Sequence, residues 1–368
     1  MYAEGEKRYV VILADFPDVE RQYPVEMIGD RLLKFVSNYF YEASYHKLTF
    51  IGEMTKQYVL PYPVEHYKIS AANLEVDKTK VLSLVNDALN AADADVEFSK
   101  DLYVVIALGA TNADYGMVGY SAVPGMLGFM NTSPITTKSG EVVGNAVVFC
   151  ENAHLGTYIH DILHMLGGIV NGRRMTPCLY DHDLQAKYAD SGEIGKFAVN
   201  MGFWDPLSSH VPYKRELPPT GLSSWTKLRL GWIDPSKIAM VFPGATTTVK
   251  LDPLVSDEAE TLVIKIPLGE YRYYLIENRQ PVGSDANLPS SGVLILYADD
   301  TVLECRHGSA PVKIKDANPD VPYLNNAAFD IGKKDVYIDK ENNLAIVLLQ
   351  KEGDSYIIQI TTPDQVDK

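Results

Sequence analysis

Two histidines and a carboxylate in the middle of the chain have the spacing of a helical metal site. His160 and His164 are four residues apart, and Asp161 follows the first of them. Side chains four apart lie on one face of a helix, so both imidazoles can reach one metal ion. A catalytic zinc ion takes three protein ligands and keeps one position for water. Because zinc lowers the pKa of that water toward neutrality, a carboxylate in the position of Asp161 can act as the general base.

The segment that carries these residues has the signals of a helix. Asn152 is expected to cap its N-terminus, and Gly167 with Gly168 to end it, because glycine adopts a left-handed conformation at low cost. Apolar residues recur at helical spacing on one face: Leu155, Ile159, Ile162, Leu163 and Leu166. The spacing of the two histidines alone is equally compatible with an ordinary helix in which both are structural. A metal site needs a third ligand from another part of the chain.

The first two thirds of the chain alternate predicted strands and helices. Continuous apolar runs predict strands that are buried on both faces: residues 9–16, 102–109 and 146–150. Helical patterns cover residues 25–43 and 77–92. Residues 110–144 are rich in Gly, Ser, Thr and Asn, which predicts a loop with short hairpins.

The pattern changes near residue 240 to short strands separated by turn signals. Their even spacing is typical of an all-β sandwich or barrel. The predicted strands are residues 249–251, 261–266, 271–277, 293–297, 336–339, 344–350 and 356–361. The sequence therefore predicts an α+β protein with domains at residues 1–240 and 241–368, the second of them β-rich and sandwich-like.

Charge and motifs exclude several classes of function. Lys and Arg number 33 and Asp and Glu 48, which gives a formal net charge of −15. A surface this acidic repels phosphate backbones, so we expect no nucleic-acid partner. The apolar runs are too short to span a bilayer. The glycine-rich loops of nucleotide-binding proteins and the Gly-x-Ser-x-Gly turn of serine hydrolases do not occur.

The cysteine count and the first residues bear on location. Cys150, Cys178 and Cys305 allow at most one disulfide, which excludes a disulfide-built scaffold and leaves secretion open. Residues 1–8 show no signal-peptide pattern. The protein is either intracellular or secreted after loss of a leader that this sequence lacks, and we expect the second.

The residues around the histidines resemble a known motif. Residues 156–167, GTYIHDILHMLG, are similar to the zinc-binding helix of the M6 metallopeptidases, the immune-inhibitor-A-like family, usually His-Glu-x-x-His-x-x-Gly-x-x-Asp. Further segments resemble that family in order along the chain: residues 10–18, 39–52, 199–208 with 222–233, and 273–296. The resemblance implies a zincin-like catalytic domain over residues 1–240, a twisted sheet with an active-site helix and a second helix behind it. It implies a zinc-dependent endopeptidase that acts on a peptide or protein substrate.

The same resemblance assigns further roles. Met201 would be the residue of the Met-turn beneath the metal, although ordinary core packing also explains a methionine. Apart from the resemblance, Tyr180 lies in the same stretch of the chain and is available to stabilise an oxyanion. Some members of the family bind calcium, and loop carboxylates that could do so here are Asp252, Asp257, Glu258, Glu260 and Asp285.

The sequence departs from the family motif at two positions, those of the general base and of the third metal ligand. Asp161 stands where the family has Glu, and its side chain is shorter by one methylene. A base displaced by about 1 Å can lose on the order of 10²-fold in rate. Val170 stands where the family has its third ligand and cannot bind metal. The alternative function is therefore a catalytically weak or inactive homologue with a binding or structural role.

An insertion offers a replacement for the third ligand. Residues 169–176 look like an insertion, so the segment that matches the family's third-ligand region lies at residues 177–181. In this alignment Cys178 occupies the position of the third ligand. A thiolate binds zinc well, and His182 is the second candidate. Asp181 and Asp183 on either side of it could also bind if the register differs by a few residues. The alternative interpretation is that residues 181–183 form a solvated acidic loop.

Overall fold

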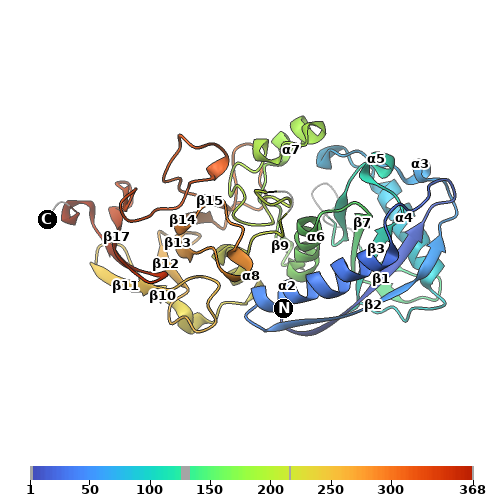
Figure 1. The fold of residues 1–368 in the computed structure, drawn as a ribbon, viewed down its shortest axis with the longest axis horizontal. Coiled ribbons are helices and arrows are strands. Elements are labelled where there is room, and N and C mark those ends of the chain that lie inside the picture. The colour runs from blue at the N-terminus through green and yellow to red at the C-terminus, as the bar shows by residue number, and fades with distance from the viewer. Residues whose placement is uncertain (1–2, 126–132, 215–216, 367–368) are drawn as a thin grey trace. The chain divides into compact units, whose positions relative to one another are not determined.

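The computed structural model describes residues 3–125, 133–214 and 217–366, and Figure 1 shows their fold. The chain divides into two compact units, which are described separately. The first comprises Met1–Pro177 and His182–Phe197, and the second comprises Cys178–Asp181 and Ala198–Lys368. Mixed sheets and helices make this an α+β protein, as predicted.

The described strands of the first unit form a sheet in the order β2-β1-β3-β7-β4. Their bounds are β1 Gly5–Asp15, β2 Leu48–Val59, β3 Tyr103–Leu108, β4 Gly119–Val123 and β7 Asn145–Cys150. All neighbours run parallel except β4, which is antiparallel to β7 and terminal in this order. The predicted strands at residues 9–16, 102–109 and 146–150 are confirmed. Part of the segment at residues 110–144, predicted as a loop with short hairpins, lies outside the described residues, namely 126–132. A short antiparallel hairpin is present in this segment, formed by residues 135–136 and 142–143. The prediction is wrong at β4, because pairing with β7 rather than local pattern makes residues 119–123 a strand.

Helices cover both faces of this sheet. The predicted helix at residues 25–43 is one continuous run of α1 (Val25–Gly29), a π-helical stretch (Asp30–Val36) and α2 (Ser37–Ala43). The second predicted helix is α4 (Lys78–Ala92), where Asp77 accepts a hydrogen bond from the Thr79 amide as N-cap. The histidine helix is α6 (Leu155–Gly167). Shorter elements are α3 Val64–Tyr67, α5 Asn112–Tyr115, α7 His182–Tyr188, β5 Ile135–Thr136, β6 Val142–Val143, β8 Ile169–Val170 and β9 Arg173–Arg174.

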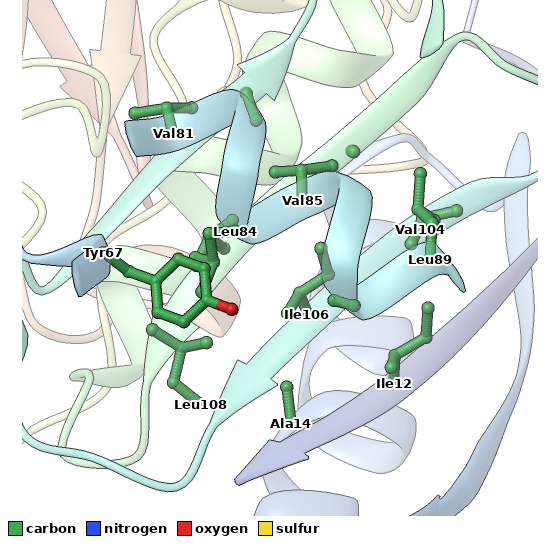
Figure 2. Packing of buried hydrophobic residues seen from close by; sticks show 14 of the residues in the cluster. Ile12, Ala14, Tyr67, Val81, Leu84, Val85, Leu89, Val104, Ile106 and Leu108 are labelled. Carbon is green, nitrogen blue, oxygen red and sulfur yellow. The ribbon is translucent and has the colours of Figure 1, made fainter. Parts of the chain in front are cut away.

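The core of the first unit explains why residues 9–14 of β1 and all of β3 are apolar. Alternate residues of the two strands pack beneath α4, as Figure 2 shows: Ile12, Ala14, Val104, Ile106 and Leu108 from the strands, with Val81, Leu84, Val85 and Leu89 from the helix. On the other face, Tyr9 and Val105 line a small cavity together with Ile162 and Met165 of α6. The sheet is therefore the middle of three layers, and α6 is held against it by apolar contacts.

The second unit contains two sheets around one core. One has the order β10-β12-β13-β14-β15 and the other β11-β18-β17-β16. Apolar residues of both sheets form a single buried cluster, which is the arrangement of a sandwich. The strands are β10 Ile238–Met240, β11 Thr247–Leu251, β12 Val263–Pro267, β13 Arg272–Arg279, β14 Gly292–Asp299, β15 Val312–Ile314, β16 Val336–Asp339, β17 Leu344–Glu352 and β18 Ser355–Thr361. Every strand predicted after residue 240 has its counterpart here, whereas β10 and β15 were not predicted.

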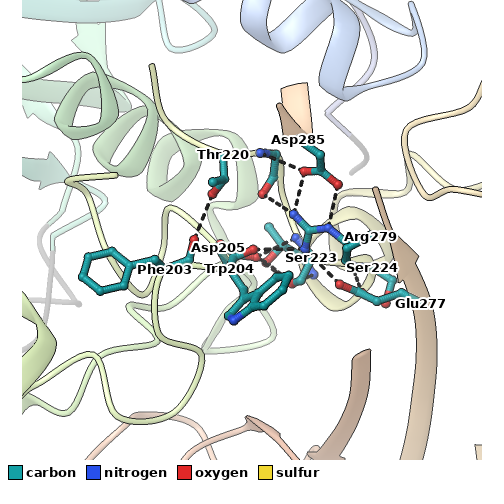
Figure 3. Close-up of polar contacts among 11 residues, drawn as sticks. Phe203, Trp204, Asp205, Thr220, Ser223, Ser224, Glu277, Arg279 and Asp285 are labelled. Carbon is teal, nitrogen blue, oxygen red and sulfur yellow. Dashed lines mark hydrogen bonds and ion pairs between the residues drawn. The ribbon is translucent and has the colours of Figure 1, made fainter. Parts of the chain in front are cut away.

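A buried ionic network holds the second unit's irregular segments to β13 (Figure 3). The guanidinium of Arg279 donates to both oxygens of Asp285 at 2.7 Å and to Glu277 at 2.9 Å. Its remaining donors bond the backbone oxygens of Trp204 and Gly221. Because every guanidinium donor has a partner, the full burial of Arg279 carries no unsatisfied hydrogen bond.

A second cluster beside it fixes the start of α8 (Ser224–Leu230). One oxygen of buried Asp205 accepts from the Ser223 hydroxyl at 2.6 Å and the Thr226 hydroxyl at 2.8 Å. Glu277 accepts from the Ser224 amide at 2.6 Å, so a carboxylate lies at the positive end of the helix. None of the helices formed by the described residues has the length and apolarity that crossing a bilayer requires.

Candidate metal centre

The N-cap of helix α6 lies two residues later than predicted. The Nδ1 atom of His154 accepts a hydrogen bond from the Gly156 amide at 3.0 Å, so His154 is the N-cap and the prediction of Asn152 is wrong. The side chain of Asn152 instead accepts from the Asn112 amide at 3.1 Å, at the start of α5. At the other end, Gly168 has a positive φ of 57°, which confirms the predicted glycine stop.

Burial of α6 is more complete than an apolar stripe predicts. All residues from Gly156 to Gly167 are buried, including His160, Asp161 and His164. Buried polar side chains are costly unless they are hydrogen-bonded or coordinate a metal. The side chains of His160, Asp161 and His164 therefore each need a hydrogen-bond partner or a metal ion to offset the cost of burial.

The two imidazoles face each other at a distance that suits a shared ion. Their Nε2 atoms are 3.1 Å apart, and the rings are nearly perpendicular at 89°. Two nitrogens bound tetrahedrally at about 2.0–2.1 Å from one zinc ion would lie about 3.3 Å apart. The helix thus presents both nitrogens almost at the separation that such an ion requires.

A backbone contact determines which nitrogen of His164 is available. Its Nδ1 lies 2.6 Å from the carbonyl oxygen of Thr176. A carbonyl only accepts, so Nδ1 carries the proton and Nε2 carries the lone pair of the neutral ring. Burial lowers the pKa of His164 well below its usual range, and the charges of His160 and Arg174 lower it further, while the Thr176 carbonyl partly offsets this. His164 is therefore neutral at physiological pH, as a metal ligand must be.

Cys178, the residue after Pro177, completes the group. One ligand atom from each of His160, His164 and Cys178 lies within 4.8 Å of the other two, and all three residues are buried. For zinc, a nitrogen and a sulfur ligand would lie about 3.6 Å apart, which is inside that limit. A set of two imidazoles and a thiolate could thus hold a metal ion, and it suits zinc or copper better than calcium or magnesium. In the described ranges no other group of three potential ligands is this close.

The other third-ligand candidate, His182, lies outside this group. His182 begins α7, and its Nδ1 lies 3.4 Å from the Nδ2 atom of Asn73, outside the three-residue group. Asp181 and His182 are 3% and 2% exposed, so the interpretation of residues 181–183 as a solvated acidic loop is wrong. Charge alone suggested solvent, but tertiary packing buries this segment.

Asp161 is buried against the edge strand of the sheet. A Cβ added at Gly119 of β4 would lie 2.9 Å from its Oδ2 atom, which shows how closely the carboxyl approaches that backbone. Burial raises the pKa of Asp161 well above its usual range, and the Arg174 guanidinium partly offsets this rise. A buried carboxyl with a raised pKa beside potential metal ligands is a candidate for proton transfer.

The remaining residues with a predicted role lie in different surroundings. Met201 is fully buried in the second unit, in a turn where its carbonyl accepts from the Trp204 amide at 3.1 Å; its place beneath a metal stays a prediction. Tyr180 is also buried, and its oxyanion role stays a prediction. Among the calcium candidates, Asp285 is engaged by Arg279, and Asp252 accepts from the Glu260 amide and the Ser355 hydroxyl. Across the described residues these carboxylates form no group of three.

Sequence reasoning missed two residues that shape the site. The carbonyl of Thr176 contacts Nδ1 of His164, and Arg174 places a buried positive charge near Asp161 and His164. Both belong to the inserted segment, for which no motif gives a register. A buried arginine and a threonine in a short hairpin have no signal in sequence alone.

Comparison of the chain with protein-family models found no match, and comparison with curated proteins found none either. The resemblance to the M6 metallopeptidases therefore stands on the sequence segments quoted above.

Proposed function

We propose that this protein is a zinc-dependent peptidase whose metal is held by His160, His164 and Cys178. The observation that supports the proposal is the buried group of two imidazoles and one thiol within 4.8 Å, with a carboxyl on the next residue of the helix. The lone pair on Nε2 of His164 and the short Nε2–Nε2 distance favour a cation between the rings. The remaining coordination position would be available to water.

The roles of the protein groups follow from their positions. Zinc bound there would polarise a substrate carbonyl and acidify a water molecule. Asp161 would take the proton on its carboxylate and return it to the leaving amine, which agrees with a carboxyl whose pKa burial raises. Strand β4 is terminal in the described sheet and packs against α6, so an extended peptide would add to its edge by backbone hydrogen bonds.

An alternative function is a metal-binding homologue without turnover. It is favoured by the short side chain of Asp161 and by its burial, since both hinder a base that must be ionised and reach the water. In that case the centre would hold the ion for binding or structure.

The test of the proposed function is cleavage of casein, an unstructured protein, with and without a chelator. We expect zinc-dependent cleavage that the chelator abolishes, that His164→Ala lacks, and that His66→Ala, which changes an exposed histidine, retains. Bound zinc without cleavage would favour the inactive homologue. Chelator-resistant cleavage, or no bound metal, would contradict the peptidase proposal.

A further inference from the structure

The segment after α6 folds back onto the helix that carries the histidines. Strand β8 pairs with β9 in register Ile169 to Arg174. The turn between them uses Asn171 and Gly172, both with positive φ. The chain then returns, and the Met175 amide donates to the Gly168 carbonyl at 3.1 Å. This short hairpin places Thr176, which is fully buried, against the last turn of α6.

Thr176 contacts the helix through two different groups. Its hydroxyl donates to the carbonyl oxygen of Leu163 at 2.6 Å, and its own carbonyl accepts from Nδ1 of His164, also at 2.6 Å. The contact requires glycine at residue 167, because a Cβ there would lie 2.1 Å from the Thr176 hydroxyl oxygen. The hydroxyl of Thr176 therefore holds Thr176 in the position from which its carbonyl contacts His164.

We infer that Thr176 is a positioning residue that fixes the tautomer and ring orientation of His164 for metal binding. The inference rests on the proposed metal-binding role of His164. A carbonyl bonded to Nδ1 leaves the lone pair on Nε2, the atom that lies 3.1 Å from Nε2 of His160. Groups that orient a metal-binding imidazole in this way typically contribute 10- to 100-fold to metal affinity.

The test compares zinc affinity in three variants by competition with a chelator. Thr176→Val keeps the shape and removes the hydroxyl, and we expect affinity to fall about 10- to 100-fold. Thr176→Ser keeps the donor and should restore affinity to within about threefold of the original protein, since its hydroxyl can make the same bond. The matched control is Thr157→Val on α6, the helix of His164. The buried hydroxyl of Thr157 has no hydrogen-bond partner among the described residues, so zinc affinity should not change in this variant.

A second measurement reads the tautomer without any metal. Nitrogen-15 NMR of the metal-free protein should show His164 protonated at Nδ1, and Thr176→Val should show a mixture of tautomers. Protonation at Nε2 in the original protein would overturn the inference, even if the valine variant did not fold. Unchanged zinc affinity in Thr176→Val would overturn it as well. If the original protein did not bind zinc, the proposed function would be contradicted. The NMR measurement of the His164 tautomer would then still test whether Thr176 fixes it.

Discussion

At the scale of residues, the thiol of Cys178 is what distinguishes this site from a helix with two histidines. Two imidazoles four residues apart are compatible with many structures, but a buried thiol within 4.8 Å of both is a third donor. Soft thiolate and imidazole donors together favour zinc and related ions. The chemistry of the proposed centre therefore depends on a residue outside the helix.

We expect Cys178→Ser to lower zinc affinity by at least about 100-fold, because losing a ligand costs more than losing a group that only orients one. The control is Cys150→Ser, since Cys150 is equally buried but donates to the Met117 carbonyl at 3.2 Å, outside the group. Chelator competition measures both. If both variants bound zinc with equal affinity, Cys178 would not be a metal ligand.

Asp161→Asn should abolish cleavage and stabilise the metal-free protein. Burial raises the carboxyl's pKa above its ordinary 3.8, so the folded state loses stability as pH rises through the folded-state pKa, while a neutral amide does not. We expect the variant to be more stable by about 1–3 kcal/mol at pH 8 and the difference to vanish near pH 4. Urea unfolding of both proteins in chelator measures it, and a variant less stable at pH 8 would contradict the assignment.

At the scale of elements, the close approach of α6 to β4 keeps Asp161 in place. A Cβ at Gly119 would meet Thr157 Cγ2 at 2.7 Å, Phe149 at 2.8 Å and Asp161 Oδ2 at 2.9 Å. Helix, strand and carboxyl are thus packed without room for a methyl group. The site's geometry is set by this packing and by the hairpin that follows the helix.

Gly119→Ala should cost about 1–3 kcal/mol in the free energy of unfolding and reduce cleavage, because the helix and the carboxyl must shift. Gly269→Ala is the control, since nothing lies within 4 Å of a Cβ there. Chemical unfolding and casein cleavage measure the two effects. If both glycine variants behaved like the original protein, α6 would not depend on this contact.

The sequence predicted the elements that local pattern determines and missed those that pairing determines. The apolar runs of β1, β3 and β7 and the period of α4 and α6 gave those elements within a few residues. Strand β4 has no such run and exists through its pairing with β7. The cap was misplaced because the imidazole of His154 does what the sequence pattern assigned to Asn152.

At the scale of the whole molecule, each compact unit has its own means of stability. The first depends on an apolar core between helices and a sheet, and the second combines a two-sheet core with the network around Arg279. That network could not be predicted, since Glu277, Arg279 and Asp285 look like surface charges in the sequence. Their partners Trp204 and Gly221 are far away in the chain.

Arg279→Met should destabilise the second unit by about 3–5 kcal/mol, because it leaves the carboxyls of Glu277 and Asp285 buried without their cation. Arg272→Met, on the same strand but exposed, should change stability by less than about 0.5 kcal/mol. Urea unfolding followed by circular dichroism compares them. A similar small loss in both variants would mean that the buried ion pairs contribute little.

The central claim, a metal ion held by two imidazoles and one thiolate, is tested most directly by X-ray absorption spectroscopy of the zinc-loaded protein. We expect one sulfur at about 2.3 Å and nitrogen or oxygen ligands at about 2.0–2.1 Å, with the multiple-scattering pattern of imidazole. The sulfur signal should disappear in Cys178→Ser. A shell of oxygen and nitrogen alone in the original protein, or no bound zinc, would contradict the claim.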